Sequence, residues 1–406
     1  MKKKQELELY IHIPFCVKKC LYCDFLSYAG ENDKIEKYME TLITEIKAFA
    51  PFGMNKTVSS IYIGGGTPSI LPETYITRIM EAVYECYAVQ KEAEISIESN
   101  PGTLDEKKLK SYKAVGVNRI SIGLQSSDDE MLRKTGRIHT YKDFLENYNL
   151  ARKTGFENIN IDYMSALPGQ TLKSYEDSIK KILLLEPEHI SAYSLIIEPE
   201  TPFYKKYAQD VVLREKGETP LYLPDEDLEY DMTKTTKELL EKCGYAHYEI
   251  SNYAKKGYEC KHNLGYWTRK EYLGFGLGAA SLYQNIRFSN ARDLKQYINM
   301  EFKAISDKVS VEYLCKSLKE QSHKEVIQLL DKQTQMEEFM FLGLRMLRGI
   351  SKEAFRSVFD NSVDEVYGIQ ILKLKQEGLL DENNAYVFPT EYGIDLNNYV
   401  CASFLR

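Results

Sequence analysis

In the first half of the chain, short apolar runs typical of strands take turns with longer stretches in which apolar residues recur at helical spacing. Short β-rich apolar runs predict strands at 7–13, 58–63, 94–98, 119–124, 158–163 and 189–195. Apolar residues at helical spacing predict amphipathic helices between them, near 33–49, 73–89, 105–115, 128–154 and 172–185. Because strands that alternate with helices indicate βαβ units, we expect an α/β fold with a parallel sheet. Six units favour a partial (β/α)6 barrel that is incompletely closed.

The pattern changes in the second half of the chain. Residues 200–230 are polar and punctuated by prolines, which predicts an irregular excursion, and an aromatic and glycine-rich block follows at 262–278. Helical patterns at 336–347, 351–359 and 363–377 precede a hairpin-like segment at 379–388, which predicts a mostly helical, winged-helix-like module. We therefore expect three domains: a barrel core at 1–225, a barrel extension at 226–305, and the C-terminal helical domain at 306–406.

Composition and charge narrow the class of protein. The 406 residues are 43% hydrophobic and 28% charged, which is ordinary for a globular protein. A net charge of −7 argues against a general basic surface, so we expect no nucleic-acid partner. Lys2, Lys3 and Lys4 are followed by no apolar stretch of the kind found in a signal peptide, and no run is long enough to span a bilayer. We expect a cytoplasmic protein with reduced thiols.

Chemically unusual segments follow most of the expected strands. They are HIPFC at 12–16, the glycine run at 64–66, ESNP at 98–101, GLQS at 123–126 and DYM at 162–164. In barrels of this kind the carboxyl ends of the strands build the active site. We therefore expect these segments to converge on one cavity.

Three of the eight cysteines are clustered after the first strand. Cys16, Cys20 and Cys23 have the spacing C-x3-C-x2-C. Structural zinc usually takes four ligands, whereas three thiolates on an iron–sulfur cubane leave one iron open. Two alternatives remain at this point: chance spacing, or a zinc site whose fourth ligand comes from the Cys260-Lys261-His262 segment.

The cysteine motif together with Gly64-Gly65-Gly66-Thr67-Pro68 resembles the radical S-adenosylmethionine (SAM) superfamily. The resemblance implies a radical SAM type of barrel, with a [4Fe–4S] cluster on the three cysteines and SAM on its open iron. Glycines would let the backbone approach the methionine amino group, and Glu98 would accept hydrogen bonds from the ribose. The implied cofactor-binding residues are Tyr10, Tyr22, Gly64, Gly65, Gly66, Thr67, Glu98, Gln125, Arg137 and Asp162.

Further motifs narrow the resemblance. YIHIPFC at 10–16, CDF at 23–25, GLQS at 123–126, HNLGYW at 262–267 and YLGFG at 272–276 are similar to the HemW family of haem chaperones. That family resembles the oxygen-independent coproporphyrinogen III oxidases (HemN), which carry a further cysteine two places after the third. Phe25 stands at that place here, and the chain begins close to its first strand without the longer N-terminal extension of such oxidases. Both differences favour the chaperone.

The resemblance to haem chaperones implies haem as a third cofactor beside the cluster and SAM. The implied partners are client haemoproteins of respiration, membrane-associated ones among the candidates, and an electron donor such as flavodoxin or ferredoxin. His262 is predicted to bind haem or to form a wall of its site; the alternative is a buried histidine beside packed aromatic rings. A second function stays open, that of a radical SAM enzyme of porphyrin biosynthesis, so the sequence leaves undecided whether the protein is an enzyme.

Overall fold

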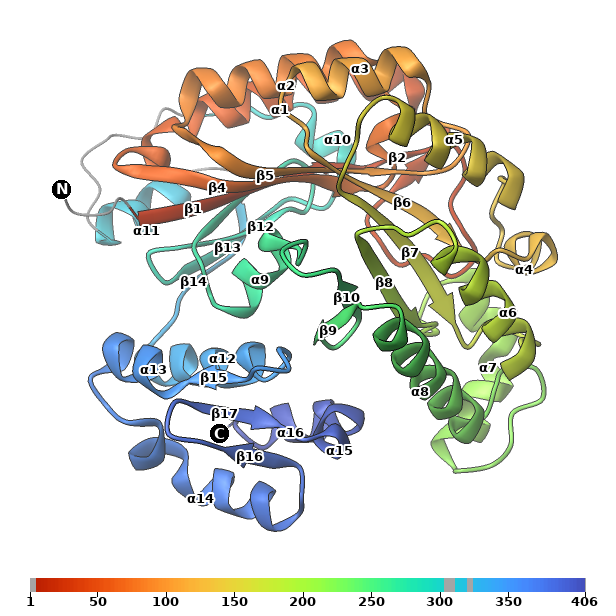
Figure 1. Ribbon diagram of the computed structural model, residues 1–406. Coiled ribbons are helices and arrows are strands. Elements are labelled where there is room, and N and C mark those ends of the chain that lie inside the picture. The colour runs from red at the N-terminus through yellow and green to blue at the C-terminus, as the bar shows by residue number, and fades with distance from the viewer. Residues whose placement is uncertain (1–4, 303–310, 320–323, 406) are drawn as a thin grey trace.

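The computed structural model describes residues 5–302, 311–319 and 324–405. Lys2 to Lys4 and the expected domain boundary at 305/306 lie outside the described residues. All six expected strands and the helices between them are present (Figure 1). The strands are β1 (Gln5–Ile13), β4 (Lys56–Gly65), β5 (Val89–Ser99), β6 (Arg119–Gln125), β7 (Ile159–Ser165) and β8 (His189–Ser194). The helices are α1 (Ile35–Ala48), α2 (Glu73–Cys86), α3 (Glu106–Ala114), α4 (Asp129–Lys134), α5 (Tyr141–Lys153) and α6 (Leu172–Leu183).

These strands form the parallel centre of one 12-stranded sheet, in the order β14-β13-β12-β11-β1-β4-β5-β6-β7-β8-β10-β9. At one edge β11 (Tyr272–Phe275) pairs parallel with β1, and β12 (Ala280–Tyr283), β13 (Ile286–Asn290) and β14 (Lys324–Leu329) extend it antiparallel. At the other edge lie β10 (Asn252–Ala254) and β9 (Ala246–Glu249). Within the described residues the sheet therefore keeps two ends, which confirms an open, partial barrel.

Side chains alternate across this sheet in a way that sets the character of the barrel interior. Leu9 and Ile11 of β1 are fully buried in the core beneath the outer helices. Glu8 and Tyr10, which alternate with them, point to the inner face. Closed (β/α)8 barrels fill this face with branched apolar residues, whereas here it buries many polar ones. They include Glu8, Ser60, Glu94, Ser96, Arg119, Ser121, Asn160 and His189. Some of these side chains bond to one another, since Asn160 donates to Ser121 and also bonds to His189.

Two expectations from the hydrophobic pattern were wrong. The helix expected over 128–154 is divided into α4 and α5, because Gly136 adopts φ +82° and turns the chain between them. The stretch expected to be irregular contains α7 (Pro202–Glu215) and the start of α8 (Glu226–Lys242). Thr201 accepts a hydrogen bond from the backbone of Tyr204, and Pro202 occupies the first turn, so proline here starts a helix.

The C-terminal module has the expected winged-helix-like form. It contains α12 (Lys332–Gly343), α13 (Lys352–Phe359) and α14 (Val363–Gln376), with a small sheet of β15 (Ile350–Ser351), β17 (Tyr386–Pro389) and β16 (Leu380–Glu382), and ends in α15 (Glu391–Asp395) and α16 (Asn397–Ala402). Its hydrophobic core, from Met336 to Phe404, is separate from the barrel core. A β-bridge between Glu249 and Met346 joins it to the barrel. Since β14 belongs to the large sheet, the three domain limits stay a proposal.

The remaining short elements connect these parts. They are β2 (Phe15–Cys16), β3 (Tyr28–Ala29), α9 (Lys261–Trp267), α10 (Leu294–Tyr297) and α11 (Val311–Lys319), with three 3-10 turns at Asn32–Lys34, Ala50–Gly53 and Pro68–Ile70. Among the described helices, none has both the length and the apolar character needed to cross a membrane.

Candidate functional site

The cysteine loop leaves the carboxyl end of β1 and is tied down on several sides. The backbone N–H of Leu21 donates to the carbonyl of Thr135 (3.0 Å), and its own carbonyl accepts from Phe203 (2.9 Å). The His12 imidazole bonds to the carbonyl of Leu26 at 2.8 Å. The N–H of Cys23 closes a turn onto the carbonyl of Cys20 (3.2 Å). A short loop held at these points brings the three cysteines to one pocket.

The glycine run at the end of β4 packs directly against this loop. The N–H of Gly66 donates to the carbonyl of Ile13 (2.8 Å), and the N–H of Thr67 donates to that of Phe15 (2.8 Å). A Cβ on Gly66 would stand 2.8 Å from the Phe15 oxygen, a backbone atom that cannot move aside cheaply. Gly65 adopts φ +112°, a conformation that other residues rarely take. The glycines therefore hold the loop and keep the backbone open to a ligand.

A polar chain links the cysteine loop to the ends of β4 and β5 and to the turn between α4 and α5. The Thr67 hydroxyl donates to the Cys16 sulfur (3.5 Å) and accepts from the Asn100 amide (2.8 Å). The Arg137 guanidinium donates to the Asn100 oxygen (2.6 Å) and to the Tyr22 hydroxyl (3.2 Å). The pocket that these residues surround has a volume of about 110 Å³. Strand ends spread over the first half of the sequence thus meet at one site, as the barrel topology predicted.

Two carboxylates in this pocket are buried. Glu98 accepts hydrogen bonds from the N–H of Gly65 (2.9 Å) and the hydroxyl of Tyr62 (2.9 Å). Burial, reinforced by the nearby Asp162, raises the pKa of Glu98 to about 7. Asp162 accepts from Ser121 (3.1 Å) and its pKa is also raised by burial. These acceptors can bind hydroxyl groups such as those of a ribose.

Burial also raises the pKa of the Cys16 and Cys23 thiols. A buried thiolate is stable only with positive charge beside it, and iron supplies that charge when it binds sulfur. The donor set therefore fits an iron–sulfur cluster. Among the described residues, no three His, Cys, Asp or Glu side chains are grouped for binding a single metal ion. A cubane instead binds each thiolate at a different iron, so its ligands stand further apart.

Most of the residues predicted for the cofactors line this one pocket: Cys16, Cys20, Cys23, Gly65, Gly66, Thr67, Glu98, Gln125, Arg137 and Asp162. Tyr22 and Gly64 stand behind it, Tyr22 bonded to Arg137 and Gly64 packed against Glu98. The individual roles stay predictions. Sequence reasoning did not single out Asn100 and Tyr193, although both follow from the rule that strand ends meet. Tyr193 donates to Gln125 (3.0 Å) from β8, the last parallel strand.

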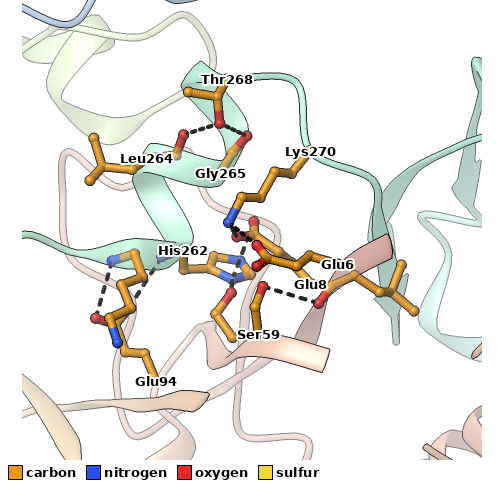
Figure 2. A network of polar contacts seen from close by, with 12 residues as sticks. Glu6, Glu8, Ser59, Glu94, His262, Leu264, Gly265, Thr268 and Lys270 are labelled. Atoms are coloured by element: carbon orange, nitrogen blue, oxygen red, sulfur yellow. Dashed lines mark hydrogen bonds and ion pairs between the residues drawn. The ribbon is translucent and has the colours of Figure 1, made fainter. Parts of the chain in front are cut away.

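Tyr10 and His262 lie elsewhere. Figure 2 shows His262 on α9, inside the barrel, beside Glu8 and Lys270. One ring nitrogen bonds to Ser60 (2.9 Å) and the other to the Tyr266 hydroxyl (3.1 Å). Burial lowers the pKa of His262 to about 3, so the ring is neutral. Both nitrogens of this imidazole are engaged in a closed interior, which supports the alternative of a buried structural histidine. A role for His262 in haem binding stays a prediction.

The zinc alternative fails for a related reason. Cys260 is fully buried and its sulfur contacts Glu94 (3.5 Å), on β5 well before the strand end. Glu94 also accepts the backbone N–H groups of Lys261 and His262, so it caps the start of α9. The segment at 260–262 therefore closes the barrel interior and does not approach the cysteine loop.

Comparisons with known proteins agree with this geometry. Residues 10–182 match the model of the radical SAM superfamily, and residues 330–396 match that of the HemN C-terminal domain. The chain is 38% identical over 398 residues to the heme chaperone HemW of Bacillus subtilis (strain 168), covering 98% of both chains. It is 36% identical to the heme chaperone HemW of Lactococcus lactis, covering 98% of this chain and 96% of that one. The structure of coproporphyrinogen III oxidase (HemN) from Escherichia coli matches with a TM-score of 0.79 at 24% identity, covering 99% of this chain and 90% of that chain, which shows a shared fold.

Proposed function

The chain belongs to the HemW family of the radical SAM superfamily, and we propose that it is a haem chaperone that delivers haem to respiratory haemoproteins. Its cofactors are a [4Fe–4S] cluster and SAM, as the radical SAM family implies, and haem is the cargo. One observation carries the proposal: the cysteine loop and five strand ends form a single pocket, in a chain that matches proteins named heme chaperone over 98% of its length.

The residues of the pocket suggest how the cofactors would be held. Cys16, Cys20 and Cys23 would bind three irons of the cluster and leave the fourth for the amino and carboxylate groups of SAM. When bound, the cluster and SAM supply one-electron reductive chemistry at the sulfonium. Gly65 and Gly66 expose backbone to the methionine part, and Glu98 accepts hydrogen bonds from the ribose.

The position of Phe25 supports a carrier over an oxidase. Its side chain is 70% exposed at the mouth of the pocket, where the oxidases that the chain resembles carry a further cysteine. A phenyl ring offers no thiol to a reaction, but it adds apolar surface beside the cluster loop. Both features fit a protein that handles a porphyrin without converting it.

The charge around the pocket bears on the other partners. Lys18 and Lys19 line its mouth next to the cysteines. A positive rim at that point suits an acidic electron carrier such as flavodoxin or ferredoxin. The net charge of −7 speaks against nucleic acid as a partner. We place the protein in the cytoplasm, where reduced thiols can take up a cluster and where client haemoproteins, those attached to the membrane included, can be reached.

The proposal is tested with anaerobically reconstituted full-length protein. We expect stoichiometric haem binding in a visible titration, and transfer of that haem to an apo-haemoprotein. In parallel, the protein is incubated with coproporphyrinogen III, SAM and a reductant, and we expect no protoporphyrinogen. Formation of protoporphyrinogen would replace the proposal with the enzyme of porphyrin biosynthesis. Failure to bind haem would overturn it as well.

A further inference from the structure

A second cavity lies on the inner face of the sheet extension, apart from the cluster pocket. It has a volume of about 340 Å³, within the range of small-molecule sites. Its walls come from β1, from β11 to β13, from the end of α9 and from α12 of the C-terminal module. In Figure 1, α9, β12 and β13 lie on the side of the barrel that faces α12 of the C-terminal module. Nothing in the proposed roles of the cluster and SAM uses this cavity.

Aromatic rings dominate the lining of this cavity. Tyr10, Tyr266, Trp267 and Tyr272 all line it. Tyr266 and Tyr272 meet edge to face with centroids 4.7 Å apart, and the Arg345 guanidinium covers the Trp267 ring at 4.6 Å. Rings fixed in this way lose little conformational entropy when a ligand binds. Such a lining suits a flat, largely apolar ligand.

Positive charge stands at the edge of the same cavity. Arg269 and Arg287, which both line it, donate to the two oxygens of the buried Glu338 at 2.9 Å and 2.6 Å. Two guanidinium groups share one carboxylate, so the cluster keeps an excess positive charge. The Arg287 side chain is 34% exposed and therefore accessible to a ligand. Arginine is well suited to binding carboxylates.

We infer that this cavity is the haem site, with the macrocycle against the aromatic rings and the propionates at Arg287 and Arg269. The inference rests on the proposed function, because it takes haem as the cargo. It also gives the two sites a shared wall. Tyr10 stacks on Tyr62 with centroids 6.4 Å apart, and Tyr62 donates to Glu98 of the cluster pocket. Haem and SAM would thus lie on opposite sides of two aromatic rings.

The lining also indicates how tightly the iron is held. Among the lining residues of the described chain, none is His, Cys or Met. Burial raises the pKa of Tyr10, Tyr266 and Tyr272, so their phenols stay protonated and are poor iron ligands. Haem would then be bound through its ring and its propionates. Weak contact with the iron suits a carrier that has to release its cargo.

The test is a variant in which a large side chain fills the cavity, compared with a variant that carries the same side chain elsewhere on the surface. Ala280 lines the cavity from β12 and is exposed, so Ala280→Trp occupies the space without removing a hydrogen bond. Ala246→Trp places the same side chain at the exposed first residue of β9, outside the cavity. Haem is titrated anaerobically into the full-length wild type and both variants, with circular dichroism and cluster absorbance as checks of folding. We expect Ala280→Trp to weaken haem binding at least tenfold and Ala246→Trp to leave it unchanged.

A second variant addresses the propionates. Arg287→Gln should weaken haem binding about tenfold but leave binding of haem dimethyl ester, which lacks the carboxylates, within twofold of wild type. If Ala280→Trp does not fold, Arg287→Gln by itself tests whether the cavity binds haem. If wild type binds haem and neither variant differs from it, the cavity is not the haem site, although the proposed function stands. If wild type itself binds no haem, the proposed function fails.

Discussion

Glu8 offers a sharp test of how the polar barrel interior is balanced. Its carboxyl is fully buried, and within the described residues neither oxygen has a partner with good hydrogen-bond geometry. The Ser60 hydroxyl is near enough only to offset part of the rise in the pKa of Glu8. His262 Nδ1 lies 3.9 Å and Lys270 Nζ 4.0 Å from the Glu8 oxygens. Figure 2 shows both side chains beside it. Burial raises the pKa of Glu8 from its ordinary 4.5 to about 8. Glu8 is therefore protonated at neutral pH, and Glu8→Gln should mimic the form that the native protein holds.

The size of the expected change in the free energy of unfolding follows from proton linkage. Because the folded protein binds this proton more tightly than the unfolded chain, folding loses stability as pH rises from 4.5 towards 8. A rise in pKa of this size lowers the free energy of unfolding, relative to its value below pH 4.5, by about 5 kcal/mol above pH 8 and by about 3 kcal/mol at pH 7. The glutamine variant does not titrate and escapes this cost, but its amide N–H groups need partners, at a cost of about 1–3 kcal/mol. We expect the variant to be no more stable than wild type at pH 5.5 and more stable by about 2–4 kcal/mol at pH 8.5.

The assay is urea unfolding of the full-length protein at pH 5.5, 7.0 and 8.5, followed by the fluorescence of Trp267, the single tryptophan. Trp267 ends α9, the helix that packs on Glu8, so its emission reports on this part of the barrel. Glu6→Gln is the control: this partly exposed side chain pairs with Lys270 at 2.7 Å, and its loss should cost less than about 1 kcal/mol. A stability difference between Glu8→Gln and wild type that stays constant from pH 5.5 to 8.5 would refute the reasoning.

Gly66→Ala should displace the cysteine loop, since its Cβ would meet the Phe15 carbonyl at 2.8 Å; reconstituted protein should hold less than half the iron and sulfide of wild type, and full cluster content would contradict this. SAM affinity, measured by equilibrium binding, should rise severalfold from pH 6 to pH 8, because Glu98, whose pKa is about 7, loses its proton and accepts hydrogen bonds with both oxygens. Glu98→Gln should weaken SAM binding roughly tenfold and remove this pH dependence. His262→Ala should destabilise the protein by about 2–4 kcal/mol in urea, because it strands two hydroxyl partners, yet leave haem affinity within threefold; a large loss of haem binding would make His262 a ligand after all.

Local patterns were sufficient for the strands and for the site that their ends build. Each strand of the barrel carries its own apolar run, so the sequence shows where the strand ends and which residues stand there. Because the carboxyl ends of barrel strands meet at one site, Cys16, Gly66 and Glu98 could be assigned to one pocket. Arg137 lies in the pocket, as expected, although its role stays a prediction, and the helix expected through it is broken at Gly136. Apolar periodicity can continue across a turn, and the φ of a single glycine decides the break.

The sequence by itself determined the six parallel strands, the cysteine loop and the family to which the chain belongs, because these depend on periodicity and on spacing within short segments. Only the tertiary structure decided which side of the sheet each later segment covers. Tyr10 stands in YIHIPFC and His262 in HNLGYW, two motifs that each combine histidine with aromatic residues. The chain packs α9 against β4 on the inner side of the barrel and adds β11 to β13 to the sheet beside β1. This buries His262 among hydrogen bonds and leaves Tyr10 on the wall of a cavity. These positions depend on contacts between segments more than 200 residues apart, and such contacts leave no periodic trace in the sequence.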